Sequence, residues 1–160
     1  MFKTFKTIIN SCGNNFTYHS KPGKQFTPIL KLDKNISPEN VQKIFQSVGW
    51  KTRHFDDIKK SLEKSILVVT AWDKDSLVGI ARATGDGIFT ATVWDLAVHP
   101  EYQRLGVGSR IINCMLTKLD AYGIPLVTLY TDCSNKDFYT KLGFGTQFNK
   151  IISMFRYRKQ

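Results

Sequence analysis

Two glycines and an arginine stand where an apolar run gives way to a helical pattern, and their types and spacing suit the binding of a phosphate group. The apolar run ends at Val98, and Arg104, Gly106 and Gly108 precede the helical pattern. A helix N-terminus leaves backbone N–H groups unpaired and carries a partial positive charge, and glycine has no β-carbon to keep an anion away from them. The pattern predicts a phosphate or pyrophosphate site; for two glycines alone, a plain helix start is the alternative.

The glycine spacing excludes two common nucleotide-binding loops. The loop is neither the Gly-x-x-x-x-Gly-Lys-Ser/Thr sequence that cradles a triphosphate nor the Gly-x-Gly-x-x-Gly sequence of a dinucleotide site. The three cysteines and three histidines form no Cys-x-x-Cys pair and no Cys/His cluster. We therefore predict no metal site.

The composition is that of one globular domain with a basic surface. The chain has 160 residues, of which 42% are hydrophobic, and a domain of this size buries a core without further supports. No apolar run approaches the roughly 20 residues that cross a bilayer, so we expect no membrane segment. The formal net charge of +10 attracts anions, whether nucleic acid, acidic lipid or a phosphorylated ligand.

We expect residues 1–25 to be a poorly ordered N-terminal extension and residues 26–160 to form the folded domain. No acidic residue precedes Asp33, and the segment lacks the apolar core and the cleavage site of a secretory signal. A cleaved targeting peptide is the alternative. Transit peptides are usually rich in arginine, whereas the first arginine of this chain is Arg53.

A strand before the glycine loop and a helix after it are needed to position it, and hydrophobic periodicity predicts both within an α/β fold. Strands are expected at residues 26–32, 66–72, 77–83, 89–98, 126–131 and within 148–157. Helices are expected to begin at Ser37, near Asp56, after Gly108 and at Ser134, and to end at Gly49, Lys64, Gly123 and Gly143. The unit at 89–131 should be a parallel crossover, and strand 126–131 has the apolar run of a fully buried strand.

The loop and a downstream aromatic motif resemble two signatures of one enzyme family. Gln103-x-x-Gly106-x-Gly108, preceded by Leu-Ala-Val-x-Pro-x-Tyr, resembles the acetyl-CoA signature of the GCN5-related N-acetyltransferase (GNAT) family. Residues 138–144, Phe-Tyr-Thr-Lys-Leu-Gly-Phe, resemble its Tyr-x-x-x-Gly-Phe signature. The resemblance covers residues 26–155, and segments 85–89, 93–95 and 154–157 are similar to the plastid and cyanobacterial subgroup. That subgroup includes plastid-encoded enzymes of red algae and the plant serotonin N-acetyltransferases.

The resemblance implies the GNAT fold, a mixed sheet of about six to seven strands flanked by about four helices. It also implies direct transfer of acetyl from the cosubstrate acetyl-CoA to a primary amine, with Tyr139 as proton donor to the CoA thiolate. Asp95 is implied to handle the amine proton, directly or through water. The residues implied to contact acetyl-CoA are Leu96, Ala97, Val98, Gln103, Arg104, Leu105, Gly106, Val107, Gly108, Ser109, Asp132, Cys133, Ser134 and Asn135.

Two of these assignments depend on local details. Strand alternation puts Asp95 and Leu96 on opposite faces unless a bulge intervenes, so Asp95 either faces the site or points away from it. Many relatives carry an asparagine seven residues before the tyrosine, where this chain has Asp132. That departure puts the polar contact to the pantetheine in doubt, and residues 132–135 enter as candidates only.

The resemblance leaves two classes of acceptor amine. The subgroup implies either an arylalkylamine such as serotonin or a protein amine, at an N-terminus or a lysine. The aromatic residues that could line an amine pocket or simply belong to the core are Trp50, Phe55, Trp72, Phe89 and Trp94. A plastid location is expected for a plastid-encoded protein and a cytoplasmic one for a bacterial protein, with a homodimer as a further expectation. A basic RNA-binding module and a non-catalytic acetyl-CoA-binding domain are the alternatives; we do not expect nucleic acid as a partner.

Overall fold

A computed structural model describes residues 18–20, 24–26, 28–146, 154 and 156 of the chain. It divides into two compact units, residues 1–130 and 131–160, and each is described here by itself. The first unit contains β1 Tyr18–Ser20, β2 Lys24–Phe26, β3 Ile29–Leu32, α1 Pro38–Ser47, α2 Phe55–Lys64, β4 Leu67–Asp73, β5 Ser76–Gly85, β6 Thr90–Val98, the 3₁₀ turn η1 Pro100–Tyr102, α3 Val107–Ala121 and β7 Leu126–Leu129.

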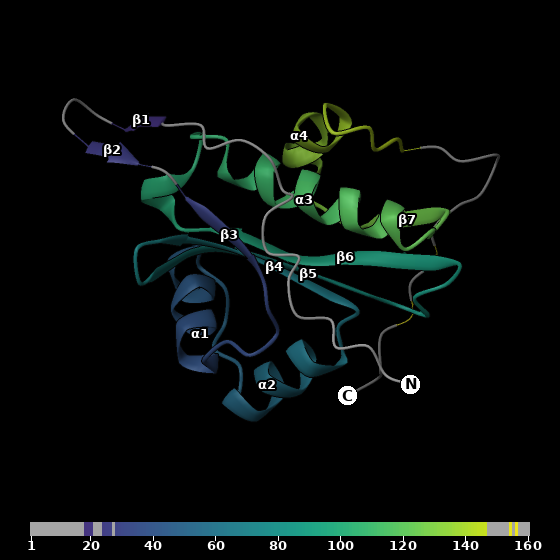
Figure 1. Ribbon diagram of the computed structural model, residues 1–160, viewed down its shortest axis with the longest axis horizontal. Helices are drawn as coiled ribbons and strands as arrows, with labels where there is room; N and C mark the ends of the chain where they lie inside the picture. The colour runs from purple at the N-terminus through teal and green to yellow at the C-terminus, as the bar shows by residue number, and fades with distance from the viewer. Residues whose placement is uncertain (1–17, 21–23, 27, 147–153, 155, 157–160) are drawn as a thin grey trace, which may run out of the picture. The chain divides into compact units, whose positions relative to one another are not determined.

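The first unit is built on a mixed five-stranded sheet in the order β3-β4-β5-β6-β7 (Figure 1). Neighbours from β3 to β6 are antiparallel, and β6 pairs in parallel with β7. The predicted parallel connection between residues 89 and 131 is therefore confirmed. Within the described residues this sheet has five strands, fewer than the six to seven expected, and β1 and β2 form a separate antiparallel pair. The strand predicted within 148–157 lies outside the described residues, apart from residues 154 and 156.

Helix α1 begins and ends as its sequence predicts. Ser37 is the N-cap, and its hydroxyl accepts a hydrogen bond from the backbone N–H of Asn40 at 3.4 Å. Pro38 occupies the first turn, where its missing N–H costs nothing. The chain leaves the helix through Gly49, which has φ 81°, a left-handed conformation that glycine adopts without strain.

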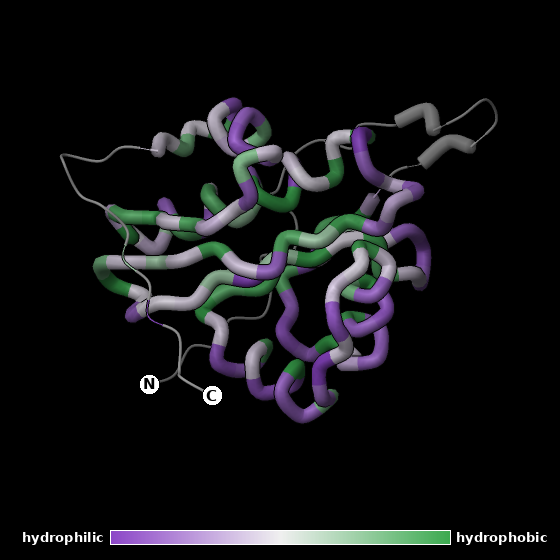
Figure 2. Tube along the Cα trace, turned by 180° about the vertical axis from the view of Figure 1, so that it is seen from behind, coloured by the Kyte–Doolittle hydropathy of each residue, from purple (hydrophilic) through white to green (hydrophobic). Residues whose placement is uncertain are grey.

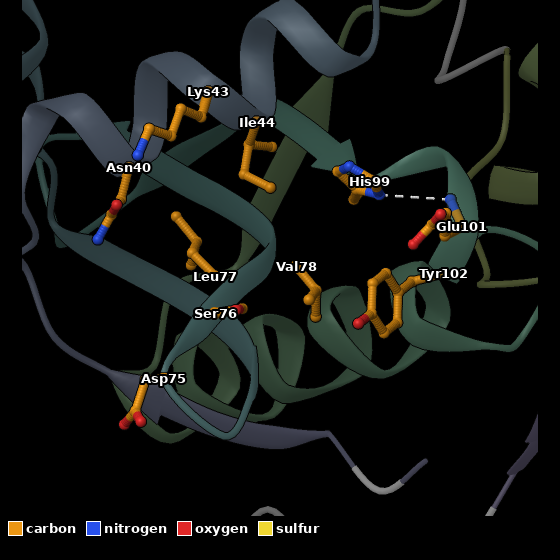
Figure 3. Close-up of a pocket in the computed structure, with 10 residues that line it drawn as sticks. All are labelled: Asn40, Lys43, Ile44, Asp75, Ser76, Leu77, Val78, His99, Glu101 and Tyr102. Carbon is orange, nitrogen blue, oxygen red and sulfur yellow. Dashed lines mark hydrogen bonds between the residues drawn. The ribbon is translucent and has the colours of Figure 1, made fainter. Parts of the chain in front are cut away.

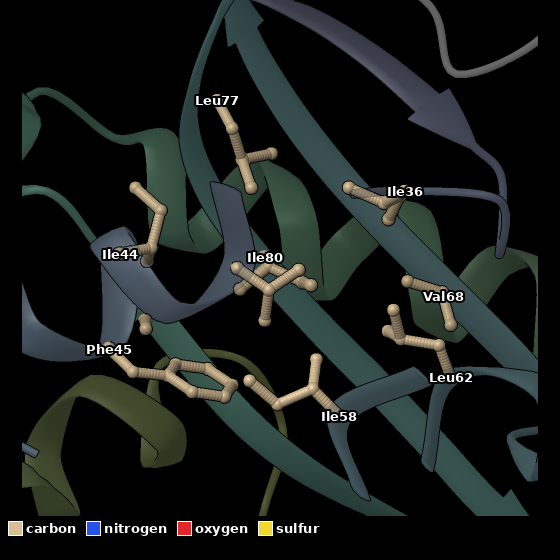
Figure 4. Close-up of a cluster of buried hydrophobic side chains, with 10 residues drawn as sticks. Ile36, Ile44, Phe45, Ile58, Leu62, Val68, Leu77 and Ile80 are labelled. Atoms are coloured by element: carbon tan, nitrogen blue, oxygen red, sulfur yellow. The ribbon is translucent and has the colours of Figure 1, made fainter. Parts of the chain in front are cut away.

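Apolar stripes of α1 and α2 form a core against one face of the sheet, and α3 covers the other face (Figure 1). Figure 4 shows the first of these clusters, in which Ile44 and Phe45 of α1 and Ile58 and Leu62 of α2 surround Ile80 of β5. Figure 2 shows hydrophobic residues along the central strands and hydrophilic residues on the outer turns of the helices. Burial of these side chains stabilises the fold by roughly 1.5–3 kcal/mol each.

Helix α3 lies unusually close to β5. A β-carbon built on Gly79 would lie 2.8 Å from Cδ1 of Ile111, a side chain that is fully buried on α3. The apolar residues spaced along one face of α3 are largely buried: Ile112, Met115 and Leu119 fully so and Leu116 half so. This packing fixes the start of α3 relative to the end of β6, which is where the glycine loop lies.

Strand β7 differs from its prediction. Its residues are exposed or half-buried, although a fully buried strand was expected. In the sheet that the described residues form, β7 is a terminal strand, and it pairs only with β6. A short strand rich in apolar residues does not distinguish a central strand from a terminal one, because both place apolar side chains against a helix.

The β5–β6 hairpin is closed by a single carboxylate. Oδ1 of Asp86 accepts hydrogen bonds from the backbone N–H groups of Ile88, Phe89 and Thr90 at 2.9, 2.9 and 3.0 Å. These bonds satisfy three donors of an exposed turn, and they lower the pKa of Asp86 below its ordinary value.

This arrangement predicts a pH-dependent effect of replacing Asp86 by alanine. Because the folded-state pKa is lowered, the carboxylate contributes stability above its unfolded pKa of about 3.9, and this contribution is lost as the pH falls through the folded pKa. We expect Asp86→Ala to lower the free energy of unfolding at about pH 7, and we expect this deficit to shrink as the pH falls through the folded-state pKa of Asp86. Urea denaturation across this range measures the difference. Asp75→Ala, in the exposed β4–β5 turn, is the control, and an Asp86→Ala deficit that stays constant with pH would contradict the assignment.

The second unit contains the 3₁₀ turn η2 Cys133–Asn135 and α4 Lys136–Thr140. A single helix from Ser134 to Leu142 was predicted, with Ser134 as its cap. The helix instead begins at Lys136 after η2, with Asn135 at the N-cap position and no capping side-chain hydrogen bond. Gly143 ends this segment at φ 90°, as predicted.

Candidate active site

A bulge in β6 sets the direction of the Asp95 side chain. The pairing of β6 with β5 shifts by one residue between Trp94 and Ala97. Asp95 itself has φ 54°, a left-handed conformation that aspartate tolerates better than most residues. A bulge places two residues against one on the neighbouring strand and re-aims the side chain that it displaces. The bulge on which the assignment of Asp95 depended is therefore present.

The Asp95 carboxylate lies between two guanidinium groups. Nε of Arg82 donates to Oδ2 at 2.5 Å, and Nη2 and Nη1 of Arg53 donate to Oδ1 and Oδ2 at 3.2 and 3.3 Å. The Asp95 side chain is only 10% exposed, whereas that of Arg53 is 41% exposed. Neither arginine could be identified from the sequence, because Arg82 and Arg53 lie 13 and 42 residues from Asp95 and no spacing rule connects them with it.

Beyond the bulge, β6 extends past the end of its pairing with β7. The register of β6 with β7 ends at the pair of Val93 and Leu129. In the described part of the chain, residues 94–98 of β6 therefore have β5 on one side and no strand on the other. The side chains of Ala97 and Val98 are buried in the core. Within the described residues no strand pairs with this segment on the side away from β5, and the carbonyl of Val98 accepts a hydrogen bond from Nε2 of Gln103. An extended ligand with amide groups could pair with such an edge as an added strand does.

The turn after β6 directs the first amides of α3 outward. Gly106 is the N-cap of α3 at φ 76° and, lacking a side chain, makes no side-chain capping bond. The first return bond of the helix runs from the N–H of Arg110 to the carbonyl of Gly106 at 3.0 Å. The amides of residues 107–109 precede it and have no acceptor within the helix. With Arg104 exposed in the same turn at φ 59°, this is an electropositive helix start suited to pyrophosphate.

Two side chains brace this turn against the sheet. Nε2 of Gln103 donates to the carbonyl of Val98 at 2.9 Å, so it ties the turn to the end of β6. The hydroxyl of Tyr102 donates to Oδ2 of Asp73 at 2.9 Å, and burial together with this bond raises the pKa of Tyr102 to about 12. The hydroxyl therefore stays protonated, and keeps its bond, throughout the neutral range.

Tyr139 lies on α4 in the second unit, in an aromatic setting. Its ring packs edge-on against Phe138 and Phe144, with centroid distances of 4.9 and 6.0 Å. Burial raises the pKa of Tyr139 above its ordinary value, and a hydrogen bond with the Thr131 side chain acts in the opposite direction. The phenol is therefore protonated at neutral pH, as a proton donor must be.

The remaining predicted contacts divide between the two units. Residues 96–98 and 103–109 follow one another along β6, the turn and α3 of the first unit, so the structure brings them together. Residues 132–135 are exposed in the second unit, where the N–H of Asn135 donates to the carbonyl of Asp132 at 2.9 Å. The thiol of Cys133 is free and exposed.

The aromatic residues considered for an amine pocket occupy different places. Trp72 is half-buried and packs against the core of α1 and α2. Trp94 is 38% exposed, and its Nε1 donates to the hydroxyl of Thr84 at 2.9 Å. Trp50 is 36% exposed and contacts the ring of Phe45 with centroids 5.0 Å apart. Among the five residues, Trp50 is the one that also contacts a partner of Asp95, since the guanidinium of Arg53 lies 5.8 Å from its ring centroid.

A separate cavity of about 520 Å³ opens on the α1 side of β5 (Figure 3). Lys43 and Ile44 of α1, Val78 of β5, and His99 and Tyr102 near η1 contribute to its walls. No predicted contact residue lines it. Nδ1 of His99 accepts from the N–H of Glu101 at 3.4 Å, so the imidazole is held in the 3₁₀ turn.

Within the described residues, no group of three or more histidine, cysteine, aspartate or glutamate side chains is arranged to hold a metal ion. Over the same part of the chain, no helix is both long enough and apolar enough to span a bilayer.

Comparison with known proteins identifies the family. The model of the acetyltransferase (GNAT) family matches residues 35–144. The chain is 33% identical to the uncharacterized N-acetyltransferase ycf52 of Porphyra purpurea over 98% of this chain and 97% of that protein. It is 33% identical to the chloroplastic serotonin N-acetyltransferase 2 of Oryza sativa over 75% of this chain and 62% of that protein.

Solved structures agree with these matches. A GNAT family acetyltransferase from Streptococcus pneumoniae superposes with a TM-score of 0.70 at 29% identity, over 82% of this chain and 99% of that one. The pairing of β6 with β7 ends at Val93, and β6 leads into the open helix start of α3. Together with these features, the matches establish that the chain belongs to the acetyltransferase (GNAT) family and is an acetyl-CoA-dependent N-acetyltransferase.

Proposed function

We propose that this enzyme transfers the acetyl group of acetyl-CoA to a primary amine, either an arylalkylamine such as serotonin or an amine of a protein. The observation that carries the proposal is the end of β6, where a backbone edge that pairs with no strand among the described residues leads directly into the open amides of α3. Such an edge suits the amides of a pantetheine arm, and such amides suit a pyrophosphate. The arylalkylamine class is supported by the match to a relative named for serotonin.

The backbone of Leu96, Ala97 and Val98 would hold the pantetheine, and residues 104–109 would hold the pyrophosphate. The bond from Gln103 to the carbonyl of Val98 supports this division, because it fixes the distance between the two parts of the site. Acetyl-CoA supplies an acetyl group that is already activated as a thioester. Residues 132–135 enter the proposal as further contacts to the cosubstrate.

Tyr139 and Asp95 are proposed to move protons. The protonated phenol of Tyr139 would give its proton to the leaving thiolate. Asp95 would bind the ammonium of the acceptor and accept its proton directly or through water. The left-handed backbone at Asp95 supports a functional role, because strained residues of this kind occur where the direction of a side chain matters.

We also propose that the enzyme works in a plastid. The support is that a relative of this chain from Oryza sativa is named as chloroplastic.

Thiol release from acetyl-CoA tests the proposal. The panel contains serotonin, tryptamine, a peptide with a free N-terminal amine and a peptide with a free lysine amine. We expect turnover with at least one amine and protection of the fold by CoA in a melting assay. Turnover confined to the two small amines would assign the arylalkylamine class, and turnover confined to the peptides would assign protein amines. CoA binding without any turnover would indicate a sensor, and the absence of both would overturn the proposal.

A further inference from the structure

We infer that the guanidinium of Arg53 occupies the place where the ammonium of the acceptor binds, so that Arg53 acts as an internal competitor that the acceptor displaces. The inference rests on the proposed function, and it names the feature of the acceptor that is recognised: a cationic amine carried beside an apolar or aromatic body. Arg53 is then a residue that determines specificity.

The contacts of Arg53 are those of a bound cation. Its two terminal nitrogens face the two oxygens of Asp95 at 3.2 and 3.3 Å. Its guanidinium carbon lies 4.7 Å from the ring centroid of Phe45 and 5.8 Å from that of Trp50. The two rings lie 5.0 Å apart and are inclined by 42°, so they form an aromatic wall on which the cation rests.

A carboxylate beside an aromatic wall is also the chemistry that recognises an organic ammonium ion. Ring faces attract a cation through their quadrupole, and a carboxylate gives a charge-assisted hydrogen bond. The wall further offers an apolar surface to the body of an arylalkylamine or to the methylene chain of a lysine. The group that Arg53 presents here therefore resembles the group that the proposed acceptor would present.

The guanidinium can leave without loss of the surrounding structure. The Arg53 side chain is 41% exposed and lies on the loop between α1 and α2. The loop is held by its backbone: Oε1 of Gln42, a buried residue, accepts from the N–H of Arg53 at 3.0 Å, and the N–H of Trp50 donates to the carbonyl of Phe45 at 2.9 Å. These bonds involve no guanidinium atom, so the aromatic wall stays when the side chain moves.

Replacing the Arg53 guanidinium by an ammonium ion leaves the net charge around Asp95 unchanged. Arg82 is 16% exposed, remains against Asp95 and holds one oxygen. An ammonium that replaces Arg53 brings the same single positive charge to the other side of the carboxylate. Breaking an ion pair is costly when it leaves a buried charge unpaired. The exchange creates no such charge at any stage.

The test compares Arg53→Met with Lys51→Met in steady-state kinetics with tryptamine and with a lysine-containing peptide. Methionine keeps an apolar stem and removes the competitor, so we expect the KM for the amine to fall about threefold to tenfold, as the loss of a partly exposed ion pair implies. The KM for acetyl-CoA should not change. Lys51→Met removes an exposed positive charge from the same loop and should leave both constants unchanged. Arg53→Lys retains the charge without the two-pronged contact. Its KM for the amine should therefore lie between those of Arg53→Met and Lys51→Met.

Binding of propylguanidinium provides a readout that is independent of turnover. This ion carries the group that Arg53→Met removes, so calorimetry should detect it bound to Arg53→Met at least about threefold more tightly than to the unsubstituted enzyme. A higher KM for the amine in Arg53→Met, or equal binding of propylguanidinium to both proteins, would overturn the inference and leave Arg53 as a residue that positions Asp95. Absence of turnover in every protein would instead contradict the proposed function, while the binding result would still decide the role of Arg53.

Discussion

Replacement of Tyr139 by phenylalanine is expected to lower kcat by about a hundredfold to ten-thousandfold, with the KM for acetyl-CoA nearly unchanged. The proposed reaction expels a thiolate, and the phenol is the group proposed to protonate it. Burial raises the pKa of Tyr139, so at neutral pH the proton is present to be given. Phenylalanine keeps the edge-on ring contacts with Phe138 and Phe144. The fold should therefore be preserved, and thiol release measured beside the melting temperature checks both expectations.

Two further measurements separate proton donation from a purely structural role. Because the pKa of Tyr139 is raised, the unsubstituted enzyme should retain its acid until the pH exceeds the ordinary tyrosine value of about 10, whereas Tyr139→Phe should lack this alkaline limb. A thioester with a more acidic thiol needs less protonation, so it should be less sensitive to the substitution. Tyr122→Phe, at the exposed end of α3, is the matched control. Equal activity of the two variants would remove Tyr139 from the mechanism.

Elements whose ends are encoded by local chemistry could be predicted from the sequence. Ser37, Pro38 and Gly49 define the limits of α1 through capping, a missing N–H and a left-handed exit, and each of these operates over a few residues. Gly123 does the same for the end of α3, whereas α3 begins at Val107 with Gly106 as its N-cap, two residues before the start predicted after Gly108. The parallel connection of β6 to β7 follows because a helix-length segment separates two strands.

The environment of Asp95 could not be predicted in this way. Alternation with period two carries no information about a single residue in the left-handed region, since the residues around it remain apolar and strand-like. The pairing of Asp95 with Arg53 depends on where the loop between α1 and α2 lies over the sheet, and this is fixed by packing between distant elements. The resemblance to the GNAT family drew attention to Asp95, but the structure provides its partners.

The start of the short helix α4 also could not be predicted from the local sequence. Ser134 has the right chemistry for an N-cap, yet the chain first makes a 3₁₀ turn and the α-helix starts at Lys136. A helix of five residues gains little from any one cap, because nucleation is unfavourable and tertiary contacts decide where it begins. Burial of β7 was overestimated for a related reason, since the position of a strand in a sheet is a global property.

Replacement of Gly106 by valine is expected to raise the KM for acetyl-CoA at least about tenfold. Gly106 has φ 76°, a conformation that costs an L-residue about 1–2 kcal/mol and a β-branched residue more. The new side chain would also stand beside the amides proposed to receive the pyrophosphate. Both effects weaken cosubstrate binding, whereas a saturating concentration of acetyl-CoA should restore much of kcat.

Gly123→Val separates these two effects within the same helix. Gly123 follows the C-terminus of α3 with φ 75°, and a β-carbon built there has no other atom within 4 Å. It therefore carries the same backbone strain as Gly106→Val but lies at the opposite end of α3. We expect the two variants to lose similar thermal stability, with only Gly106→Val affecting the KM for acetyl-CoA. An unchanged KM in Gly106→Val would mean that the glycine serves only to begin the helix, which is the alternative that two glycines on their own allow.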